Sequence, residues 1–592
     1  MNKFARIFAK TANIWRGLVA VFLLLTIVAC FMTQLAFDNK ITINSVLGLT
    51  DSRTEKTGDA EPIYPYKSEF AADVKNPTQE EFDALKAASK EQAINEMKEG
   101  AVLLRNNDVN GAPALPLAKG ASISLFGHAS EDPLYKPPSG GAQYSGNPQT
   151  NVKDGLAQAG FKINDTLYNA YANARSSGTY GSGTRSEVMT VGDWNLYEAE
   201  PAFYEQSGLR DSYKNYGDAA VIFLARTAGE NRDCPTGNVE RDAIWYQRED
   251  PTQDYLALFP EEEALLSEVK AYKDNGTFKK VILVLNTSNL VQMPWLDEYG
   301  IDACLYTAGY GHHGTIALGS ILCGETNPSG RLVDTWAYDF QSSPAMTNFG
   351  AFTYTNADQM LTAENRITEN PEKVEHYVVY AEGIYIGYKY YETRYEDAVL
   401  GNGDADSDVG SSTEDSWKYS DEVQYPFGYG LSYTDFSLEI VEEECSYDPE
   451  KKGEEFTIAV KVTNTGDVAG KRSVQLYVQA PYIEYGVEKS SVQLVGFGKT
   501  GVLAPAGQEG DSETIKITVD KYLLASYDYE GLNDNGVTGY ILDAGDYRFA
   551  VGDSVHDALN YILADKDATG MTNHDGSDFA PDATNHVWKW NL

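Results

Sequence analysis

The spacing of apolar residues changes once along this chain, near residue 434, and this change constrains the fold more than any other feature. Before it, apolar residues form continuous runs such as "AAVIFLAR" (219–226) and "KKVILVLNTS" (279–288). Stretches with the spacing of helices lie between these runs. Strands that are apolar on both faces and alternate with helices predict a mainly parallel sheet covered on both sides. We therefore expect an α/β sandwich domain over residues 90–345.

After residue 434 the apolar residues alternate with polar ones, as in "FTIAVKVTNTG" (456–466), and turn-forming residues separate the short strands. This period of two predicts an immunoglobulin- or fibronectin III-like β-sandwich over residues 434–558. A true immunoglobulin domain is disfavoured because no Cys…Trp…Cys pattern is present. We expect residues 559–592 to be a linker-like tail.

Residues 346–433 are predicted to be a long connection that contains an acidic insert, "LGNGDADSDVGSSTEDS". The spacing of its aspartates is similar to a calcium-binding EF-hand loop. However, Val409 stands where the sharp turn of such a loop needs glycine, so a solvated loop is the favoured interpretation.

The N-terminus has basic residues followed by an uncharged apolar run, "GLVAVFLLLTIVACFMTQLAF" (17–37). The run is long enough to cross a bilayer as a helix, and the preceding basic residues favour a cytoplasmic N-terminus. We expect residues 1–16 in the cytoplasm, a single-pass anchor in the cell membrane at 17–37, and an extracellular stalk at 38–89. The alternatives are a cleaved signal peptide and a lipoprotein modified at Cys30.

Composition excludes several classes of function. The chain has 87 acidic and 47 basic residues, a formal charge of −40, so it repels phosphate backbones and no nucleic-acid partner is expected. Its five cysteines lie far apart without metal-ligand spacing; only a bridge between Cys304 and Cys323 stays open. The adjacent His312 and His313 are interpreted as loop residues rather than metal ligands, and we expect no cofactor.

Glu230 is the candidate catalytic residue. It follows the apolar run Val221–Ala225 and lies beside Gly229, Arg226, Arg232 and Asp233. In sheets of this type, ligands and catalytic groups gather at the carboxyl ends of strands. An ordinary surface or helix-start glutamate is the alternative.

Several segments point to one family. "VIFLARTAGENRD" is similar to the strand and loop that carry the acid/base glutamate in family 3 glycoside hydrolases, the β-glucosidase family. "EGAVLLRN", "LCGETNPSGRLVDTWAYD", "EGIYIGYKYYETR" and "YPFGYGLSYTDF" resemble further characteristic segments of the family, in its order. "VKVTNTGDVAGKRSVQLYV" resembles the fibronectin type III-like domain that follows them. The resemblance covers roughly residues 90–555.

The resemblance implies retaining hydrolysis of a β-linked oligosaccharide or glucoside, with Glu230 as acid/base. Such a mechanism needs a second carboxyl about 5–5.5 Å away as the nucleophile. In the family this is an Asp on a TIM barrel, which we do not find in this sequence. We therefore expect the acid/base-bearing half of an enzyme with reversed domain order, completed by a barrel in a longer or separate chain. The alternative is a noncatalytic, membrane-anchored carbohydrate-binding or scaffold protein derived from such an enzyme.

Overall fold

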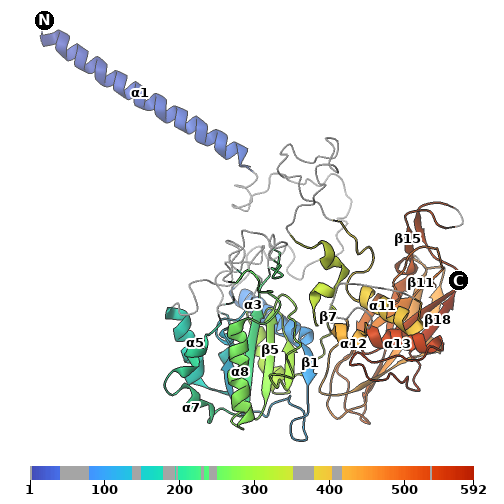
Figure 1. Cartoon of the computed structure of the whole chain (residues 1–592). Helices are drawn as coiled ribbons and strands as arrows, with labels where there is room; N and C mark the ends of the chain where they lie inside the picture. Colours follow the sequence, from blue (N-terminus) through green and yellow to red (C-terminus); the bar gives the residue numbers. More distant parts are fainter. Residues whose placement is uncertain are drawn as a thin grey trace. The chain divides into compact units, whose positions relative to one another are not determined.

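The computed structural model describes residues 3–40, 79–135, 149–177, 194, 196, 198–228, 233–238, 250–350, 379–402, 417–451, 453–533 and 536–592. The chain divides into two compact units, Met1–Phe82 and Asp83–Leu592. The first contains the continuous helix α1 (Lys3–Asp38), drawn in blue (Figure 1). Within it, Ile14–Phe37 is long and apolar enough to cross a membrane, a test that a signal sequence also passes.

The second unit begins with a six-stranded sheet in the order β1-β6-β5-β4-β2-β3. Its strands are β1 (Val102–Asn106), β2 (Ser122–Phe126), β3 (Lys162–Ile163), β4 (Ala219–Arg226), β5 (Val281–Thr287) and β6 (Ala303–Tyr306). Strands β2 to β6 pair in parallel, and β1 runs antiparallel to β6 at the edge. Every residue of β4 and β5 is buried, which explains their continuous apolar sequences. The predicted mainly parallel sheet is confirmed.

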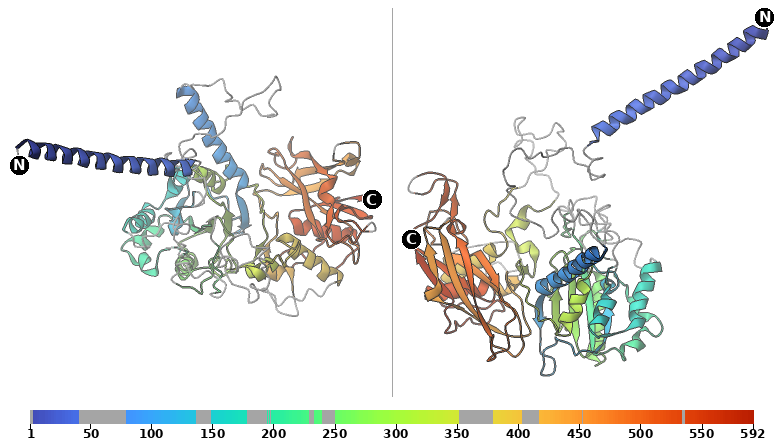
Figure 2. Two further views of the ribbon diagram at one scale, coloured as in Figure 1. Left: turned by 90° about the horizontal axis from the view of Figure 1, so that it is seen from above. Right: turned by 180° about the vertical axis from the view of Figure 1, so that it is seen from behind.

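Helices cover both faces of this sheet (Figure 1 and Figure 2). They are α3 (Gln79–Gly100), α4 (Val152–Gln158), α5 (Asp165–Ser177), α7 (Leu209–Tyr213), α8 (Pro260–Asp274) and α9 (Gly314–Leu322), with 3₁₀ turns η1 (His128–Ser130) and η2 (Pro201–Glu205). Helices α5, α7 and α8 share one apolar core with the sheet, and α3, α4 and α9 share the other. Helices α4 and α9 approach so closely that a Cβ on Gly155 would meet the Thr315 carbonyl oxygen at 2.4 Å. Two packed layers therefore hold the strand ends in place.

The predicted connection is partly folded. Its described elements are β7 (Trp336–Ala337), η3 (Phe340–Ser342), η4 (Pro344–Asn348), α11 (Tyr388–Leu400), α12 (Tyr419–Glu422) and β8 (Val423–Tyr425). Strands β7 and β8 pair with each other, and Tyr391 and Tyr395 of α11 join a separate apolar core with Leu559 and Leu563. The acidic insert from residue 403 to 416 lies outside the described residues.

The period-two region forms two facing sheets, as predicted. One contains β9 (Phe436–Ile440), β10 (Ser446–Asp448), β11 (Glu455–Asn464) and β14 (Ser512–Asp520); the other contains β12 (Ser473–Gln479), β13 (Gln493–Lys499), β17 (Asp546–Val551) and β18 (Val587–Asn591). Alternate residues enter the shared core, most clearly in β14. Strands β15 (Ser526–Asp528) and β16 (Gly539–Ile541) form a separate pair, and the 3₁₀ turns η7 (Glu442–Glu444) and η8 (Lys521–Leu524) complete the region.

The segment predicted as a linker-like tail, residues 559–592, is folded. Helix α13 (Val555–Asp565) runs into it, and strand β18 pairs antiparallel with β17. Trp588 and Trp590 of β18 pack on Phe456 at ring-centroid distances of 6.4 and 4.9 Å. The prediction was wrong because the residues before Val587 are polar and typical of a linker. They precede a short edge strand, β18, whose aromatic side chains help to cover the sandwich core.

All five cysteines lie in described parts of the chain, and all are free. Cys304 is buried in β6, and Cys323 follows α9. The bridge that the sequence left open between them is therefore not formed.

Candidate active site

Glu230 belongs to residues 229–232, which lie outside the described residues. The structure does describe the two stems of this segment. One stem is the end of β4 and residues 227–228, and the other is residues 233–238. These stems fix the two ends of the segment, so we use them to locate the candidate site.

Arg226 anchors the first stem. Its side chain is fully buried and its guanidinium donates to both carboxylate oxygens of Glu262, at 2.6 and 2.7 Å. It also donates to the carbonyl oxygens of Tyr255 (2.7 Å) and Ala257 (2.8 Å). Glu262 in turn accepts from the Phe259 N–H at the start of α8. Arg226 is therefore occupied by structural contacts that join β4 to α8.

Tyr255 and Asn289 tie the two stems together. The Thr227 N–H donates to the Tyr255 hydroxyl at 3.0 Å, and the Asn289 side-chain amide donates to the Thr227 carbonyl oxygen at 3.0 Å. On the second stem, the same amide lies 3.5 Å from the Cys234 sulfur, and the Tyr255 N–H donates to the Pro235 carbonyl oxygen at 3.1 Å. Both ends of the Glu230 segment are thus fixed at the carboxyl end of β4.

The packing around the second stem is close. Gly237 has a φ of +78°, and a Cβ there would meet the Thr252 carbonyl oxygen at 2.5 Å. Burial raises the pKa of the Cys234 thiol to about 12, so this cysteine is not a thiolate near neutral pH. Asp254 accepts from the Leu256 N–H and from Gln292, and burial raises the pKa of its carboxyl.

A cavity of about 390 Å³ adjoins the site and shares Asn289 with it. It lies at the carboxyl ends of β5 and β6 and is lined by Leu256, Ser288, Asn289, Leu290, Tyr306, Leu332, Val333, Asp334 and Phe340. Asp334 is its lining carboxyl; burial raises the pKa of that group, while a hydrogen bond from the Thr335 N–H opposes the shift. A carboxyl whose pKa is shifted beside a cavity is a common feature of functional sites.

Sequence reasoning did not single out Asp334. Its place in the motif "NPSGRLVDTW" was the one sequence feature that could have pointed to it. This motif follows β6 in the chain, and Asp334 lines the cavity at the ends of β5 and β6. His313, interpreted from the sequence as a loop residue, lies beside α9, where its ring nitrogen Nδ1 contacts the Thr150 hydroxyl at 2.9 Å. Among the described residues, no group of His, Cys, Asp and Glu could hold a metal ion.

This arrangement suits one side of a two-sided reaction centre. A glutamate on a segment tethered at a strand end can be presented to a ligand, and the neighbouring cavity offers a place for one. A retaining glycosidase needs two carboxyls about 5–5.5 Å apart, so this centre would require a second carboxylate to complete it.

Comparison with known proteins identifies the domains. Residues 101–388 match the glycosyl hydrolase family 3 C-terminal domain, and residues 472–555 match the fibronectin type III-like domain. The chain is 32% identical over 488 residues to a beta-glucosidase of Ruminococcus albus, a match that covers 81% of this chain and 41% of the relative. It is 29% identical over 479 residues to beta-glucosidase A of Butyrivibrio fibrisolvens, with coverages of 78% and 49%.

Solved structures agree in fold. A beta-glucosidase from Paenibacillus barengoltzii matches with a TM-score of 0.58 at 25% identity, covering 85% of this chain and 44% of that chain. Beta-glucosidase 3B from Thermotoga neapolitana matches in fold with a TM-score of 0.55 at 23% identity, with coverages of 81% and 53%. The chain thus spans about half the length, or less, of these relatives. Residues 101–388 belong to the glycosyl hydrolase family 3 C-terminal domains, and a fibronectin type III-like domain follows them at residues 472–555.

Proposed function

We propose that this chain supplies the acid/base-bearing half of a retaining, β-glucosidase-like glycoside hydrolase, with Glu230 as the acid/base. One observation carries the proposal: Tyr255 and Asn289 fix both stems of the Glu230 segment at the carboxyl end of β4, beside a cavity. Ligands of open α/β sheets gather at such strand ends. The beta-glucosidase relatives, matched over most of this chain, support a glycoside as the substrate class.

In the proposed reaction, Glu230 first donates its proton to the glycosidic oxygen as the bond to the leaving group breaks. A carboxylate nucleophile attacks the opposite side of the anomeric carbon and forms a glycosyl–enzyme intermediate. Glu230, now deprotonated, takes a proton from water as the water attacks that carbon and releases the nucleophile. We assign the nucleophile to an aspartate on a TIM-barrel domain in a longer or separate chain.

We also propose that α1 anchors this half-enzyme in the cell membrane as a single pass, with residues 1–16 in the cytoplasm. The Ile14–Phe37 segment has the length and composition for a span. A mature protein that retains residues 14–37 and fractionates with membranes after alkaline washing would support the anchor. A mature N-terminus beyond residue 37, read by mass spectrometry, would replace the anchor with a signal sequence.

The test of the catalytic role compares Glu230→Gln with the matched control Glu263→Gln, an exposed glutamate in the first turn of α8. Both variants are assayed in the complete enzyme, with the barrel present, on aryl β-glucosides with good and poor leaving groups. We expect Glu230→Gln to lower the rate by about 10²–10⁴-fold on the poor leaving group and much less on the good one. Added azide should then rescue turnover and yield the β-glycosyl azide.

Three outcomes would count against the proposal. Equal rates for wild type and Glu230→Gln would remove the acid/base role. Equal losses in Glu230→Gln and Glu263→Gln would indicate a folding effect. Normal turnover by residues 1–592 alone, purified in detergent, would contradict the need for a nucleophile from outside this chain.

A further inference from the structure

The fibronectin III-like domain exposes a group of tyrosines that the proposed reaction does not use. Tyr522, Tyr527, Tyr529 and Tyr540, here called the tyrosine patch, have exposed fractions of 55%, 53%, 73% and 59%. They come from η8, from strands β15 and β16, and from the residue after β15. Neighbouring exposed aromatic rings mark interaction sites more often than isolated ones do.

The patch is built as a unit. Tyr527 and Tyr540 lie directly opposite each other in the antiparallel β15–β16 pair, and their ring centroids are 5.0 Å apart. The Tyr540 ring is also 4.7 Å from that of Tyr522. Tyr540 therefore connects the three rings into one surface.

The patch does not serve the sandwich core. Among the strands that the structure describes, β15 and β16 pair only with each other and belong to neither four-stranded sheet. The apolar core of the domain contains the buried Tyr547 but none of the four patch residues. Stability of the domain thus gives no reason for large aromatic rings at these positions.

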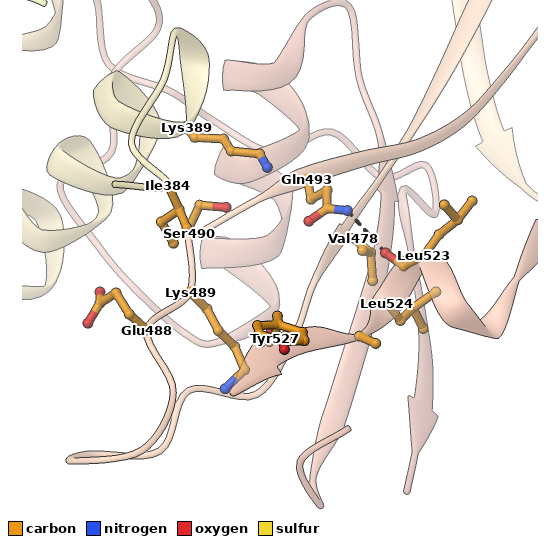
Figure 3. Close-up of a pocket in the computed structure, with 13 residues that line it drawn as sticks. Ile384, Lys389, Val478, Glu488, Lys489, Ser490, Gln493, Leu523, Leu524 and Tyr527 are labelled. Carbon is orange, nitrogen blue, oxygen red and sulfur yellow. Dashed lines mark hydrogen bonds between the residues drawn. The ribbon is translucent and has the colours of Figure 1, made fainter. Parts of the chain in front are cut away.

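A pocket of about 230 Å³ continues from Tyr527 (Figure 3). Val478, Leu523 and Leu524 form part of its apolar wall. Its polar side chains include Lys389, Glu488, Lys489, Ser490, Gln493 and Ser526, and Figure 3 shows Lys389 and Gln493 on the same side of the pocket. Small-molecule sites commonly combine an apolar wall with a few converging polar groups.

Some of these polar groups already form hydrogen bonds among the described residues, whereas the Lys389 ammonium does not. Lys489 donates to Asp543 at 2.5 Å and to the Val487 carbonyl oxygen at 3.2 Å. The Gln493 amide nitrogen donates to the Leu523 carbonyl oxygen at 3.0 Å. By contrast, the described part of the chain provides no hydrogen bond or ion pair for the Lys389 ammonium, and burial lowers the pKa of that group.

These features select the chemistry of the ligand. A sugar ring has an apolar C–H face that can lie against an aromatic ring and hydroxyls that can both accept from Lys389 and donate to the Gln493 carbonyl oxygen. A purely apolar ligand would leave the pocket's polar groups desolvated and unpaired. A polyanion is disfavoured because Glu488 faces the same pocket and the chain has a formal charge of −40.

We propose that the tyrosine patch and the adjoining pocket form a noncatalytic binding site for a neutral glycan chain. One sugar unit occupies the pocket against Tyr527, and the following units extend over Tyr540 and Tyr522. This site is independent of the Glu230 segment. It would keep a polymeric ligand attached to the protein whether or not hydrolysis takes place.

The experiment measures binding of cellohexaose by calorimetry, and of barley β-glucan and hydroxyethylcellulose by affinity electrophoresis, to the full chain in detergent. We expect binding by the wild type and about tenfold weaker binding for Tyr540→Ala and for Tyr527→Ala. Tyr540→Phe keeps the ring and should bind like the wild type. Lys389→Met should weaken cellohexaose binding several-fold. The matched control is Phe497→Ala, which removes another ring of the same domain that is 77% exposed.

Thermal unfolding of each variant, followed by circular dichroism, separates lost binding from lost folding. The proposal fails if the wild type binds none of the three probes, if Tyr527→Ala/Tyr540→Ala binds like the wild type, or if Phe497→Ala loses as much. Tighter binding of polygalacturonate than of the neutral probes would overturn the neutral ligand class. A dimer that depends on the patch, with no glycan binding, would assign the patch to a second copy of the chain. Glu230→Gln must leave binding unchanged, so this test and that of the catalytic role can fail separately.

Discussion

Two fully buried ion pairs hold this protein together in different ways. In the α/β sheet domain, Arg226 of β4 binds Glu262 of α8 with both side chains removed from solvent. In the later part of the chain, His556 of α13 binds Glu392 of α11 at 2.9 Å, again with both side chains fully buried. Arginine keeps its charge at all accessible pH values, whereas histidine titrates near neutral pH. The cation of the first pair therefore stays charged through neutral and alkaline pH, whereas the cation of the α11–α13 pair does not.

The bonding of His556 explains why its charge matters. Its Nε2 lies 2.9 Å from the Thr572 carbonyl oxygen and its Nδ1 lies 2.9 Å from a Glu392 oxygen. A carbonyl oxygen accepts only, so two donated bonds require the imidazolium when Glu392 is ionised. Tyr419 also donates to Glu392 and stacks on the His556 ring at 3.8 Å. Glu392 raises the pKa of His556 against the opposing effect of burial.

Breaking the arginine–glutamate pair should have the greatest consequence. Arg226→Met leaves the Glu262 carboxylate buried without its partner, and this should lower the free energy of unfolding by about 3–5 kcal/mol. Urea unfolding of the full chain in detergent, followed by circular dichroism, measures the loss. The double change Arg226→Met/Glu262→Met removes both charges and should recover most of it. A loss below about 1 kcal/mol for the single variant would contradict the structural role assigned to Arg226.

The second prediction separates the two pairs by pH. Because the folded-state pKa of His556 is raised, its stabilisation is complete below its unfolded pKa of about 6.5 and is lost as pH rises through the folded value. The wild type should therefore lose stability as pH rises above about 6.5 and through the raised folded-state pKa, at a slope of up to about 1.4 kcal/mol per pH unit. In His556→Gln the free energy of unfolding should change less with pH in this range. In Arg226→Met it should be lower at every pH but change with pH as in the wild type. An unchanged slope in His556→Gln would assign the pH dependence to other groups.

Asp557 provides a smaller effect at lower pH. Burial raises its pKa to about 6, with Asp553 adding to the shift, while a bond from Ser554 opposes it. Because the folded state raises this pKa, it disfavours the ionised carboxylate. The free energy of unfolding should therefore fall as pH rises from about 4 to 6. Asp557→Asn should remove this slope and stabilise the protein at pH 7 by about 1–2 kcal/mol. Asp553→Asn is the control, because that carboxylate is mostly exposed and should leave most of the slope in place.

The fold was predictable where local patterns carry the signal. Continuous apolar runs such as Ala219–Arg226 predicted buried parallel strands, and alternation predicted the sandwich, because burial on two faces or one dictates the period. The linker-like tail was wrong because β18 gains its stability from β17 and from aromatic contacts with Phe456, which is more than a hundred residues away in the chain. Such contacts leave little trace in a five-residue strand.

The candidate site was predictable only in part. Glu230 followed from its place after a buried strand and from the family resemblance, and its role stays a prediction. Tyr255, Asn289 and Asp334 were not foreseen, because loops that follow different strands bring them together. Arg226 was noticed as a neighbour of Glu230, yet only its bonds to Glu262 identify it as an anchor.

An ion cluster that is not buried should give the weakest response of all. Glu99 of α3 binds Lys471 and Lys499 of the sandwich region, with all three side chains between 29% and 40% exposed. The hydrogen bonds from the two lysines outweigh partial burial and lower the pKa of Glu99, so its contribution is present above its unfolded pKa and is lost as pH falls. Glu99→Gln should cost about 1 kcal/mol or less at low salt and almost nothing in about 1 M NaCl, where exposed charges are screened. The control Glu96→Gln changes an exposed glutamate of the same helix. If Glu99→Gln lowered the free energy of unfolding by about 3 kcal/mol or more even in high salt, burial would not explain why the two buried ion pairs stabilise more than this exposed cluster.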